Sequence, residues 1–541
     1  MNHIELFAGC GGLSLGLETE GFELLLANEL SPMAAETFSH NILNVTLENS
    51  KLAPSTPVYW ISSACERHDL EGRLTENPEN AVGLLGESDF KSLKLTAKEL
   101  RGSLLVGSIV DLNTILTEDK ELAQSIRRGF GDGGVDLVSG GPPCQSFSMA
   151  GLRQRSNPRN LLPLAFANFV QETNPKIALL ENVSGILRPF RQDGKPDYAW
   201  HNVAKEFAER GFVPLCLHVN ARYAGAAQNR PRFIMLAFRE DFAHDLLRSK
   251  IDRHFWKALL DAHTFYVCVH DMKIEMEYGS LDCHEIEKDA DIFSSPLLAS
   301  LVEYKGKEFT VRDAIDDLKG EGIAASKYVE LINGALGDRF GDVEGSIKNN
   351  RPPLNGNRVK SRFRLYQVLN KMRKSGRREV LSFIKDVGST RMGVKEIAEL
   401  GKAVSNATIN ELNEKDNWLL TLEGERFSPG SRRKTLSFLA TLHTKKQTQK
   451  ALVANQPAPA ALSIPDDACH YDESLQRTLT VREMARFQSF PDGFEFMSKV
   501  TTGGQMRKFQ VPQYTQVGNA VPPLLGKALG KVCRKLLEAV E

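Results

Sequence analysis

The feature of this sequence that most constrains its fold is a regular alternation of short apolar runs and helical stretches in the first 240 residues. Strands that alternate with helices pair in parallel, and a doubly wound sheet of this kind binds ligands at the carboxyl ends of its strands. We therefore predict an α/β fold built on a doubly wound, mostly parallel sheet. The predicted strands are 3–7, 22–27, 104–107, 135–139, 176–180, 213–220 and 232–238, and the predicted helices are 12–20, 32–40, 161–172 and 200–210.

The pattern changes along the chain and divides its 541 residues into three parts. Residues 1–240 form the predicted sheet domain, with an insertion at about 49–101 that is rich in Ser, Glu, Lys and Pro. Between 241 and 476, Pro, Gly and charged residues interrupt every candidate element, which predicts a second, irregular domain. Residues 477–541 end in an apolar helix that is long enough to pack back on the first domain.

Composition narrows the class of protein. The chain carries 68 basic and 68 acidic residues, so its net charge gives no sign of a nucleic-acid partner. The eight cysteines are scattered without a C-x-x-C pair, which favours a reducing compartment, and no apolar run is long enough for a membrane helix. We expect a cytoplasmic protein with no membrane association. The group Cys268, His270, Cys283 and His284 fits no common zinc spacing, so we expect no metal site.

A glycine-rich turn, Phe7-Ala8-Gly9-Cys10-Gly11-Gly12, follows the first predicted strand. Glycines let the backbone turn sharply and approach a ligand at a helix amino terminus. Such a turn alone is as often a simple tight turn as a binding loop. The second strand, however, leads to Glu29, 20 residues after Gly9, where a carboxylate can accept hydrogen bonds from both hydroxyls of a ribose. The turn and the acid together favour an adenosine-containing cofactor.

The strand at 135–139 runs into Gly140-Gly141-Pro142-Pro143-Cys144. The glycines and prolines force an abrupt exit from the strand and present the Cys144 thiol at the carboxyl edge of the sheet. The alternative is a buried, inert cysteine. The next strand leads to Glu181, and because consecutive strands in such a sheet are usually neighbours, this carboxylate is predicted beside Cys144. Its alternative is a helix cap or a surface acid.

These segments resemble the motifs of the DNA (cytosine-5)-methyltransferase family. Six blocks match in the family's order across nearly the whole chain, and PPCQ, ENV and a distant QVGNAVPP together are far more specific than any one of them. The resemblance implies methyl transfer from S-adenosyl-L-methionine to carbon 5 of a cytosine flipped out of double-stranded DNA. The blocks are FAGCGGLSLGLE from Phe7, GGPPCQSFSMAG from Gly140, ENVSGIL from Glu181, QNRPR from Gln228, LTVREMARFQSFPD from Leu479 and QVGNAVPP from Gln516.

In the chemistry that the resemblance implies, the Cys144 thiolate adds to carbon 6 of cytosine and makes carbon 5 nucleophilic. Glu181 would hold nitrogen 3 and the exocyclic amine, with Arg232 supporting the same edge and Arg230 as a second candidate for that role. These four intact residues count against one alternative, a catalytically inactive DNA-binding relative. A second alternative is an RNA cytosine-5 methyltransferase, but the compact RNA branch carries a Cys-Phe-Thr signature that this chain lacks.

The cofactor contacts implied by the resemblance follow the carboxyl edge of the predicted sheet. Two positions depart from the family: Ser108 stands where an acid usually binds the adenine amine, so that Asp111 could substitute, and Leu30 stands where an aromatic residue often follows the ribose acid. Both departures bear on cofactor affinity and not on cofactor identity. The implied contacts are Phe7, Gly9, Gly11, Gly12, Glu29, Ser108, Ile109, Pro142 and Asn519.

Two basic stretches are candidates for DNA binding. Residues 351–378 contain ten Lys or Arg and residues 426–450 contain seven, both without an acid, although such runs are often only solvated faces. The segment 145–160 resembles the family's mobile loop that closes on DNA. The predicted DNA contacts are Ser148, Arg153 and Arg155 in that loop, and Arg358, Lys360 and Arg362 in the first basic stretch.

The resemblance also implies a biological setting. It is restriction-modification in a bacterium or phage, in which a cognate restriction endonuclease would act separately. We expect the methyltransferase itself to act as a monomer.

Overall fold

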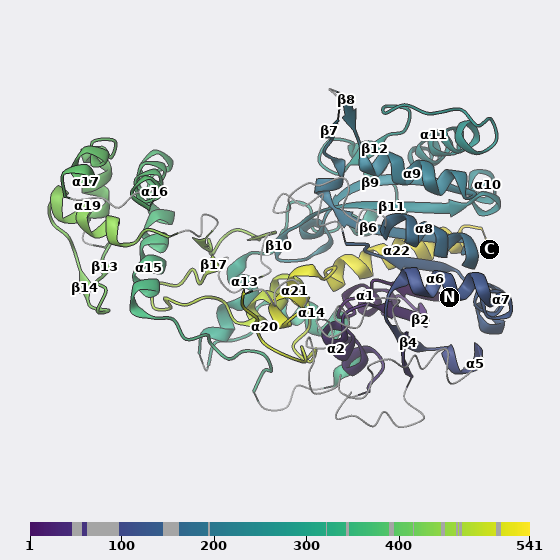
Figure 1. The fold of residues 1–541 in the computed structure, drawn as a ribbon, viewed down its shortest axis with the longest axis horizontal. Coiled ribbons are helices and arrows are strands. Elements are labelled where there is room, and N and C mark those ends of the chain that lie inside the picture. The colour runs from purple at the N-terminus through teal and green to yellow at the C-terminus, as the bar shows by residue number, and fades with distance from the viewer. Residues whose placement is uncertain are drawn as a thin grey trace.

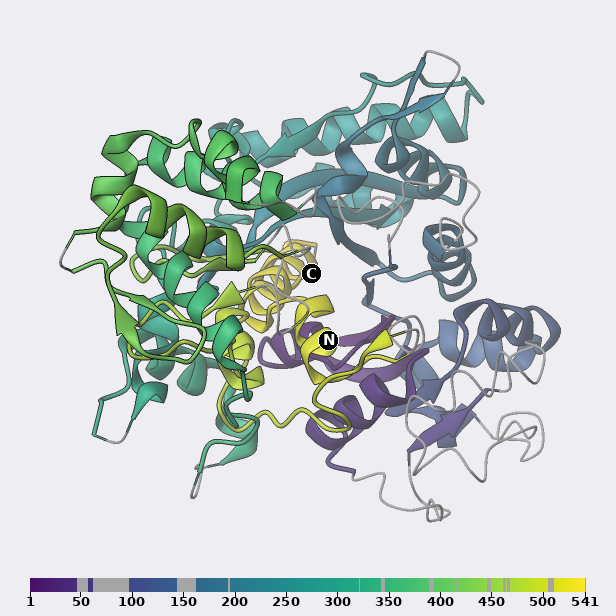
Figure 2. The ribbon, with the colours of Figure 1, turned by 60° about the vertical axis from the view of Figure 1, so that its left-hand side comes forward.

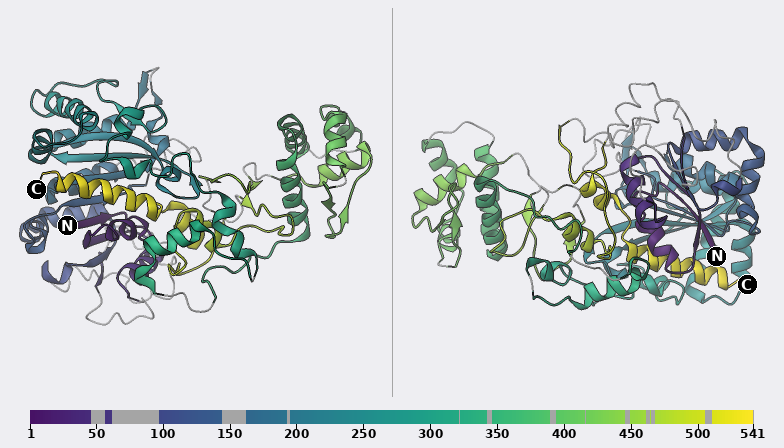
Figure 3. Two further views of the ribbon diagram at one scale, coloured as in Figure 1. Left: turned by 180° about the vertical axis from the view of Figure 1, so that it is seen from behind. Right: turned by 90° about the horizontal axis from the view of Figure 1, so that it is seen from below.

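The computed structural model describes residues 1–45, 57–61, 97–143, 162–192, 195–320, 322–341, 346–388, 394–414, 416–444, 449–460, 464, 468–504 and 510–540. A large lobe built on one sheet and a smaller helical lobe stand apart, with a narrower middle section between them (Figure 1). Views from behind and from below give the same separation (Figure 3). Among the helices of these segments, none is long and apolar enough to cross a membrane.

The large lobe contains a sheet of nine strands in the order β12-β9-β11-β6-β5-β1-β2-β4-β3. β11 runs antiparallel to both of its neighbours, and every other pair is parallel. This arrangement confirms the predicted α/β class with a mostly parallel sheet. The strands are β1 (Asn2–Leu6), β2 (Glu23–Glu29), β3 (Val58–Trp60), β4 (Ser103–Val106), β5 (Leu137–Gly140), β6 (Ile177–Val183), β9 (Phe212–Asn220), β11 (Pro231–Arg239) and β12 (Cys283–Glu285).

Helices cover the sheet, and its central strands are therefore apolar along their length. In β11, for example, every residue from Phe233 to Phe238 is fully buried, as expected for a strand covered on both faces. The helices of this lobe are α1 (Gly12–Glu18), α2 (Pro32–Ile42), α5 (Ala97–Leu100), α6 (Ile109–Glu118), α7 (Lys120–Arg127), α8 (Leu162–Thr173), α9 (Ala199–Glu209), α10 (Glu240–Arg248), α11 (Arg253–His270), α12 (Ala290–Phe293) and α22 (Pro523–Glu538). A hairpin of β7 (Phe190–Gln192) and β8 (Lys195–Asp197) follows β6.

The C-terminal helix α22 lies alongside α1 (Figure 3). The two backbones approach closely, since a Cβ added to Gly16 in α1 would lie 2.3 Å from the backbone nitrogen of Lys527. The last helix of the chain is thus packed against the first.

The sheet lobe extends beyond the boundary that the sequence placed at residue 240. α10 and α11 follow β11 directly, and β12 adds an edge strand by pairing with β9. The main hydrophobic core includes Leu298 and Leu301 together with residues of the sheet. The sheet and its core therefore include residues that follow position 240.

The smaller lobe, drawn in green in Figure 2, has its own hydrophobic core, made by residues between Phe363 and Cys469. It is more regular than the sequence suggested, because basic residues lie between its apolar ones and hide their helical spacing. Arg364, for example, is fully buried in the first helix of the lobe, α15. The elements are α15 (Asn357–Lys371), α16 (Lys374–Gly388), α17 (Val394–Gly401), α18 (Asn406–Leu412), α19 (Arg432–Thr441) and the hairpin of β13 (Leu419–Leu420) and β14 (Arg426–Phe427).

The middle section joins the lobes and contains most of a second core cluster. One of its helices begins with a capping box, in which Thr480 and Glu483 satisfy each other's backbone N–H groups. Its elements are α13 (Val311–Ile315), α14 (Lys327–Leu336), β10 (Gln228–Asn229), β15 (Lys450–Ala451), β16 (Ala458–Pro459), β17 (Ala468–Cys469), α20 (Val481–Phe487) and α21 (Gln513–Asn519).

Candidate active site

The parallel strands β1, β2, β4, β5 and β6 all end at one edge of the sheet. The glycine-rich turn, Glu29 and Glu181 lie at or just beyond these strand ends. In Figure 1 this carboxyl edge is turned toward the helical lobe. The sheet therefore brings together residues that the sequence separates by more than a hundred positions.

Glu181 and Arg232 form a buried ion pair at this edge. β11 pairs with β6, and Nε of Arg232 lies 2.5 Å from Oε1 of Glu181. Both residues are less than a tenth exposed. Burial lowers the pKa of Arg232, and the charge of Glu181 opposes that shift. The pair presents a carboxylate and a guanidinium together in a largely water-excluded place, where charge interactions are strong.

The segment that precedes Cys144 lies directly against Glu181. A Cβ added to Gly141 would lie 2.9 Å from Oε2 of Glu181, so the absence of a side chain there leaves room for the carboxylate. Nδ2 of Asn182 donates a 3.1 Å hydrogen bond to the carbonyl of Pro142. The two strand ends are thereby tied together. Cys144 itself lies outside the described residues, two positions after Pro142.

Arg230 immediately precedes β11, the strand that carries Arg232, and has different partners. Its Nη2 donates to the carbonyls of Gly518 at 2.7 Å and Ala520 at 2.9 Å, and its Nη1 donates to that of Ala460 at 3.4 Å. The structure therefore brings Arg232, and not Arg230, into direct contact with Glu181.

The Glu29 carboxylate joins two loops at the cofactor end of the edge. Its Oε2 accepts a 2.8 Å hydrogen bond from the backbone N–H of Gly9, and its Oε1 accepts one of 2.7 Å from that of Ser31. Gly9 has a φ of 56°, and nothing lies within 4 Å of where its Cβ would be. An acid fixed by backbone donors beside an open glycine is suited to a ribose-bearing ligand.

The other two glycines of the turn have a structural explanation. A Cβ on Gly11 would lie 2.8 Å from Ile42, and one on Gly12 would lie 2.3 Å from the carbonyl oxygen of Val521. These glycines permit close packing against α2 and against the segment before α22. Phe7 has a φ of 54°, an uncommon conformation for a bulky residue, which here begins the turn.

The remaining predicted cofactor contacts have diverse positions. Ser108 is the N-cap of α6, where its Oγ accepts from the N–H of Val110 at 3.1 Å, and Ile109 is buried in the main core. Pro142 is buried at the end of β5, whereas Asn519 is exposed at the end of α21. Ser108 and Ile109 follow β4, so their backbone lies at the same edge as Glu29.

The predicted DNA contacts divide into three groups. Ser148, Arg153 and Arg155 lie outside the described residues. Arg358 and Lys360 are exposed on α15, where Arg358 donates to the carbonyl of Thr441 at 2.7 Å. Arg362 is buried and donates to the carbonyl of Leu442 at 3.1 Å, so its guanidinium binds the protein's own backbone.

Two residues with clear roles at the edge were not among the predicted site residues. Asn182 ties β6 to Pro142, and Gly141 makes room for the Glu181 carboxylate. Both adjoin residues that were predicted. The period of two in a strand could have indicated that Asn182 and Glu181 point to opposite faces and so serve different partners.

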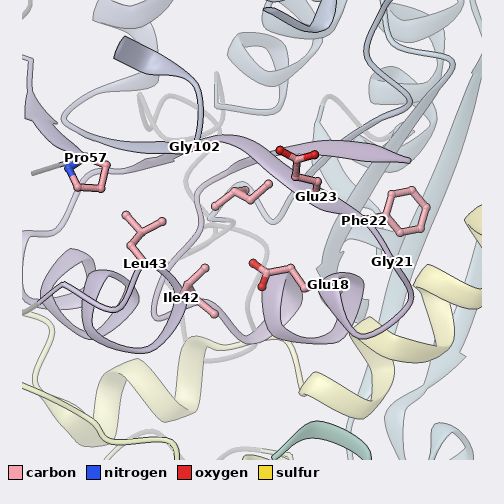
Figure 4. A pocket seen from close by; sticks show the side chains of 9 residues that line it. Glu18, Gly21, Phe22, Glu23, Ile42, Leu43, Pro57 and Gly102 are labelled. Atoms are coloured by element: carbon pink, nitrogen blue, oxygen red, sulfur yellow. The ribbon is translucent and has the colours of Figure 1, made fainter. Parts of the chain in front are cut away.

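A surface pocket lies elsewhere on the sheet lobe (Figure 4). Its lining includes Glu18, Glu23 and Gly102, which lie at the end of α1, the start of β2 and just before β4. It therefore opens at the amino edge of the sheet, opposite Glu29 and Glu181, and is separate from the site described above.

Comparisons with known proteins show which family this chain is similar to. The family of C-5 cytosine-specific DNA methylases matches residues 1–55 and 113–535. The type II methyltransferase M.DdeI of Desulfomicrobium norvegicum is 25% identical over 98% of this chain and 88% of its own length. The type II methyltransferase M.AgeI of Thalassovita gelatinovora is 23% identical over 99% of each chain. A solved structure of an E. coli prophage protein, described as a DNA modification methyltransferase, covers 99% of both chains at 18% identity and a TM-score of 0.42.

Proposed function

The chain belongs to the C-5 cytosine-specific DNA methylase family and is a DNA cytosine-5 methyltransferase, and from this premise we propose which residues carry out its reaction. Cys144 is the nucleophile, and Glu181 with Arg232 binds the flipped cytosine. The observation that carries this proposal is the buried Glu181–Arg232 pair beside the segment that leads to Cys144.

The proposed reaction is an addition of the thiolate to the ring, followed by methyl transfer and then by elimination of the thiolate. The Cys144 thiolate would form a bond to carbon 6, and the electron pair of the 5,6 double bond would move toward carbon 5. Carbon 5 would then attack the methyl group of S-adenosyl-L-methionine, whose bond to sulfur would break with its electron pair left on the sulfur of the departing thioether. A base then removes the proton from carbon 5, and the thiolate leaves as the double bond re-forms. The role of Glu181 is to hold nitrogen 3 and the exocyclic amine while charge develops on the ring.

The ion pair supports this role for Glu181. The buried guanidinium of Arg232 contacts the carboxylate of Glu181. This contact can hold Glu181 in one orientation before the cytosine arrives. The Asn182 bond to Pro142 in turn fixes the strand end that carries Glu181 relative to the chain that carries Cys144. The base and the nucleophile would thus meet at a preorganised edge.

The proposed cofactor is S-adenosyl-L-methionine, which supplies an activated methyl group. The residues at the cofactor end fit it, because Glu29 is fixed between the Gly9 and Ser31 N–H groups and Gly9 leaves open space beside it. In this role Glu29 accepts from the ribose hydroxyls.

We further propose that the enzyme works in a restriction-modification system in the cytoplasm. The relatives named above are type II methyltransferases, and their similarity extends over nearly the whole chain. A restriction endonuclease of the same specificity would act as a separate protein, and the methyltransferase would act as a monomer.

Bisulfite sequencing of DNA from a host that expresses the protein tests this function. Protected cytosines at one recurring sequence are the expected result, and expression of Cys144→Ala should remove the protection. DNA with no protected cytosine, from a host in which the wild-type protein is present and folded, would contradict the proposal.

A further inference from the structure

Arg230 is a buried arginine to which the proposed function assigns no contact with the cytosine or with the cofactor. It is 2% exposed, and all of its hydrogen-bond acceptors in the described part of the chain are backbone carbonyls. Burial and the neighbouring charge of Arg232 lower its pKa, while Glu181 raises it. Burying a guanidinium is costly unless its donors are hydrogen-bonded, and charge-assisted hydrogen bonds to carbonyls are strong.

The segment held by Arg230 is the end of α21 and the turn after it. Nη2 donates to the carbonyls of Gly518 and Ala520, the two residues that flank Asn519. One guanidinium group therefore fixes the backbone on both sides of Asn519. In Figure 1, α21 and β10 lie at the end of the sheet that faces the helical lobe.

The same segment also contacts the glycine-rich turn. The Cys10 thiol donates to the carbonyl of Gln516 at 3.8 Å, and the missing Cβ of Gly12 leaves room for the carbonyl of Val521. Residues 516–521 therefore lie between the glycine-rich turn and Arg230. They connect the cofactor end of the edge with the strand that carries Arg232.

We propose, on the basis of the function given above, that Arg230 is a positioning residue for cofactor binding. It fixes the backbone of Gly518–Ala520 against the glycine-rich turn and does not contact the cytosine. Arg232, two residues further along the chain and within β11, contacts Glu181 instead. The two arginines of the QNRPR block thus serve opposite ends of the site.

The experiment compares Arg230→Lys with Arg482→Lys. Arg482 is a matched control, because it is also fully buried and donates only to backbone carbonyls, those of Lys348, Pro491 and Phe494. None of these carbonyls belongs to residues 516–521. Each variant is measured for thermal stability, for S-adenosylmethionine affinity by calorimetry without DNA, and for kcat and KM with DNA.

For Arg230→Lys we expect Kd and KM for S-adenosylmethionine to rise about tenfold, since a lysine can reproduce only part of the geometry of the two charge-assisted bonds that Arg230 makes to Gly518 and Ala520. The kcat at saturating cofactor should stay within about threefold of the wild-type value, because the proposed base contacts are intact. Arg482→Lys should lower the melting temperature about as much as Arg230→Lys does, while leaving cofactor affinity unchanged.

Three results would overturn this assignment. Unchanged cofactor affinity in Arg230→Lys would remove the link to the cofactor. A large loss of kcat with unchanged affinity would place Arg230 on the base. An equal loss of affinity in Arg482→Lys would reduce the effect to general destabilisation. A wild-type protein that methylates no cytosine would refute the proposed function instead, and the calorimetric comparison would still decide the role of Arg230.

Discussion

The sheet lobe and the helical lobe use their charged residues in different ways. In the sheet lobe, the buried pair Glu181–Arg232 and the backbone-bound Glu29 gather at the ends of parallel strands. In the helical lobe, basic residues on one face of the same helix differ in burial: Arg358 is exposed, whereas Arg362, one turn further along α15, is buried. Arg364 is buried as well and lies over the ring of Trp418, with its guanidinium carbon 3.8 Å from the ring centroid.

The difference shows what a charged residue in a sequence does and does not indicate. At a strand end, the fold dictates where the side chain goes, because all parallel strands finish at one edge. On a helix, the segments that pack against each turn decide whether a basic residue is exposed or buried, and the long apolar stem of arginine allows either. A basic stretch is therefore weaker evidence for a binding surface than an acid at a strand end.

The largest effect should come from the nucleophile at the sheet edge. Cys144→Ser should lower kcat by at least about a thousandfold, because a hydroxyl is a far poorer nucleophile than a thiolate. DNA affinity should stay near the wild-type value, since the proposed phosphate contacts lie elsewhere. Steady-state methylation and binding titrations on one preparation measure both quantities, and a serine variant that retains wild-type turnover would disprove the role of Cys144.

A smaller but still large effect is expected for the acid. Glu181→Gln keeps the size of the side chain but removes the negative charge beside Arg232, and kcat should fall about a hundredfold. Glu285→Gln, at the end of an outer strand of the same sheet, is the matched control and should have little effect. Equal losses in the two variants would mean that the position of Glu181 has no special role.

A substitution at the cofactor end of the edge should weaken the binding of S-adenosylmethionine. Glu29→Ala removes the acceptor of the Gly9 and Ser31 N–H groups together with the proposed ribose contact. We expect S-adenosylmethionine binding to weaken by about 1 to 3 kcal/mol, with DNA affinity unchanged. Calorimetry with the cofactor alone measures this change, and an unaltered Kd would move the ribose site away from Glu29.

The smallest effects should distinguish exposed from buried basic residues in the helical lobe. Replacing the exposed Arg358 and Lys360 by Ala should lower the slope of log DNA affinity against log salt, by about 0.9 for each phosphate that the variant no longer binds. Arg362→Ala should instead lower the free energy of unfolding by about 1 to 3 kcal/mol and leave the slope unchanged, because Arg362 binds the carbonyl of Leu442.

Titrations at several salt concentrations, together with chemical denaturation, measure both properties of each variant. A wild-type slope in the Arg358/Lys360 double variant would show that this part of α15 is only a solvated face. The DNA surface would then have to be sought in residues 426–450. A changed slope in Arg362→Ala would mean that the buried guanidinium contributes to DNA binding after all.

The sheet was predictable because its main strands have a clear sequence pattern. Continuous apolar runs located β1, β2, β4, β5, β6, β9 and β11 to within a few residues. The short edge strands β3 and β12 were not predicted, since three residues give no periodicity to recognise. The helices of the smaller lobe escaped detection because their apolar residues alternate with arginines and lysines that look like solvent-facing charges.

Part of the site could be anticipated and part depended on contacts that no motif displays. The approach of β5 to β6 was expected from strand order, and the structure places Gly141 against Glu181. The different partners of Arg230 and Arg232 could not be predicted, because one partner, the segment 518–520, is almost 300 residues away in the chain. Similarly, the roles of Gly11 and Gly12 became clear only from the atoms that surround them.

The most direct test of the account is covalent trapping at the sheet edge. With DNA that carries 5-fluorocytosine at the methylated position, carbon 5 has no proton to lose, so the thiolate of Cys144 cannot be expelled after methyl transfer. In the presence of S-adenosylmethionine, denaturing gels and peptide mass spectrometry should show a protein–DNA adduct at Cys144 in the wild type and none in Cys144→Ser. An adduct that forms equally in the serine variant, or one attached at another residue, would contradict the assignment of Cys144 as the nucleophile.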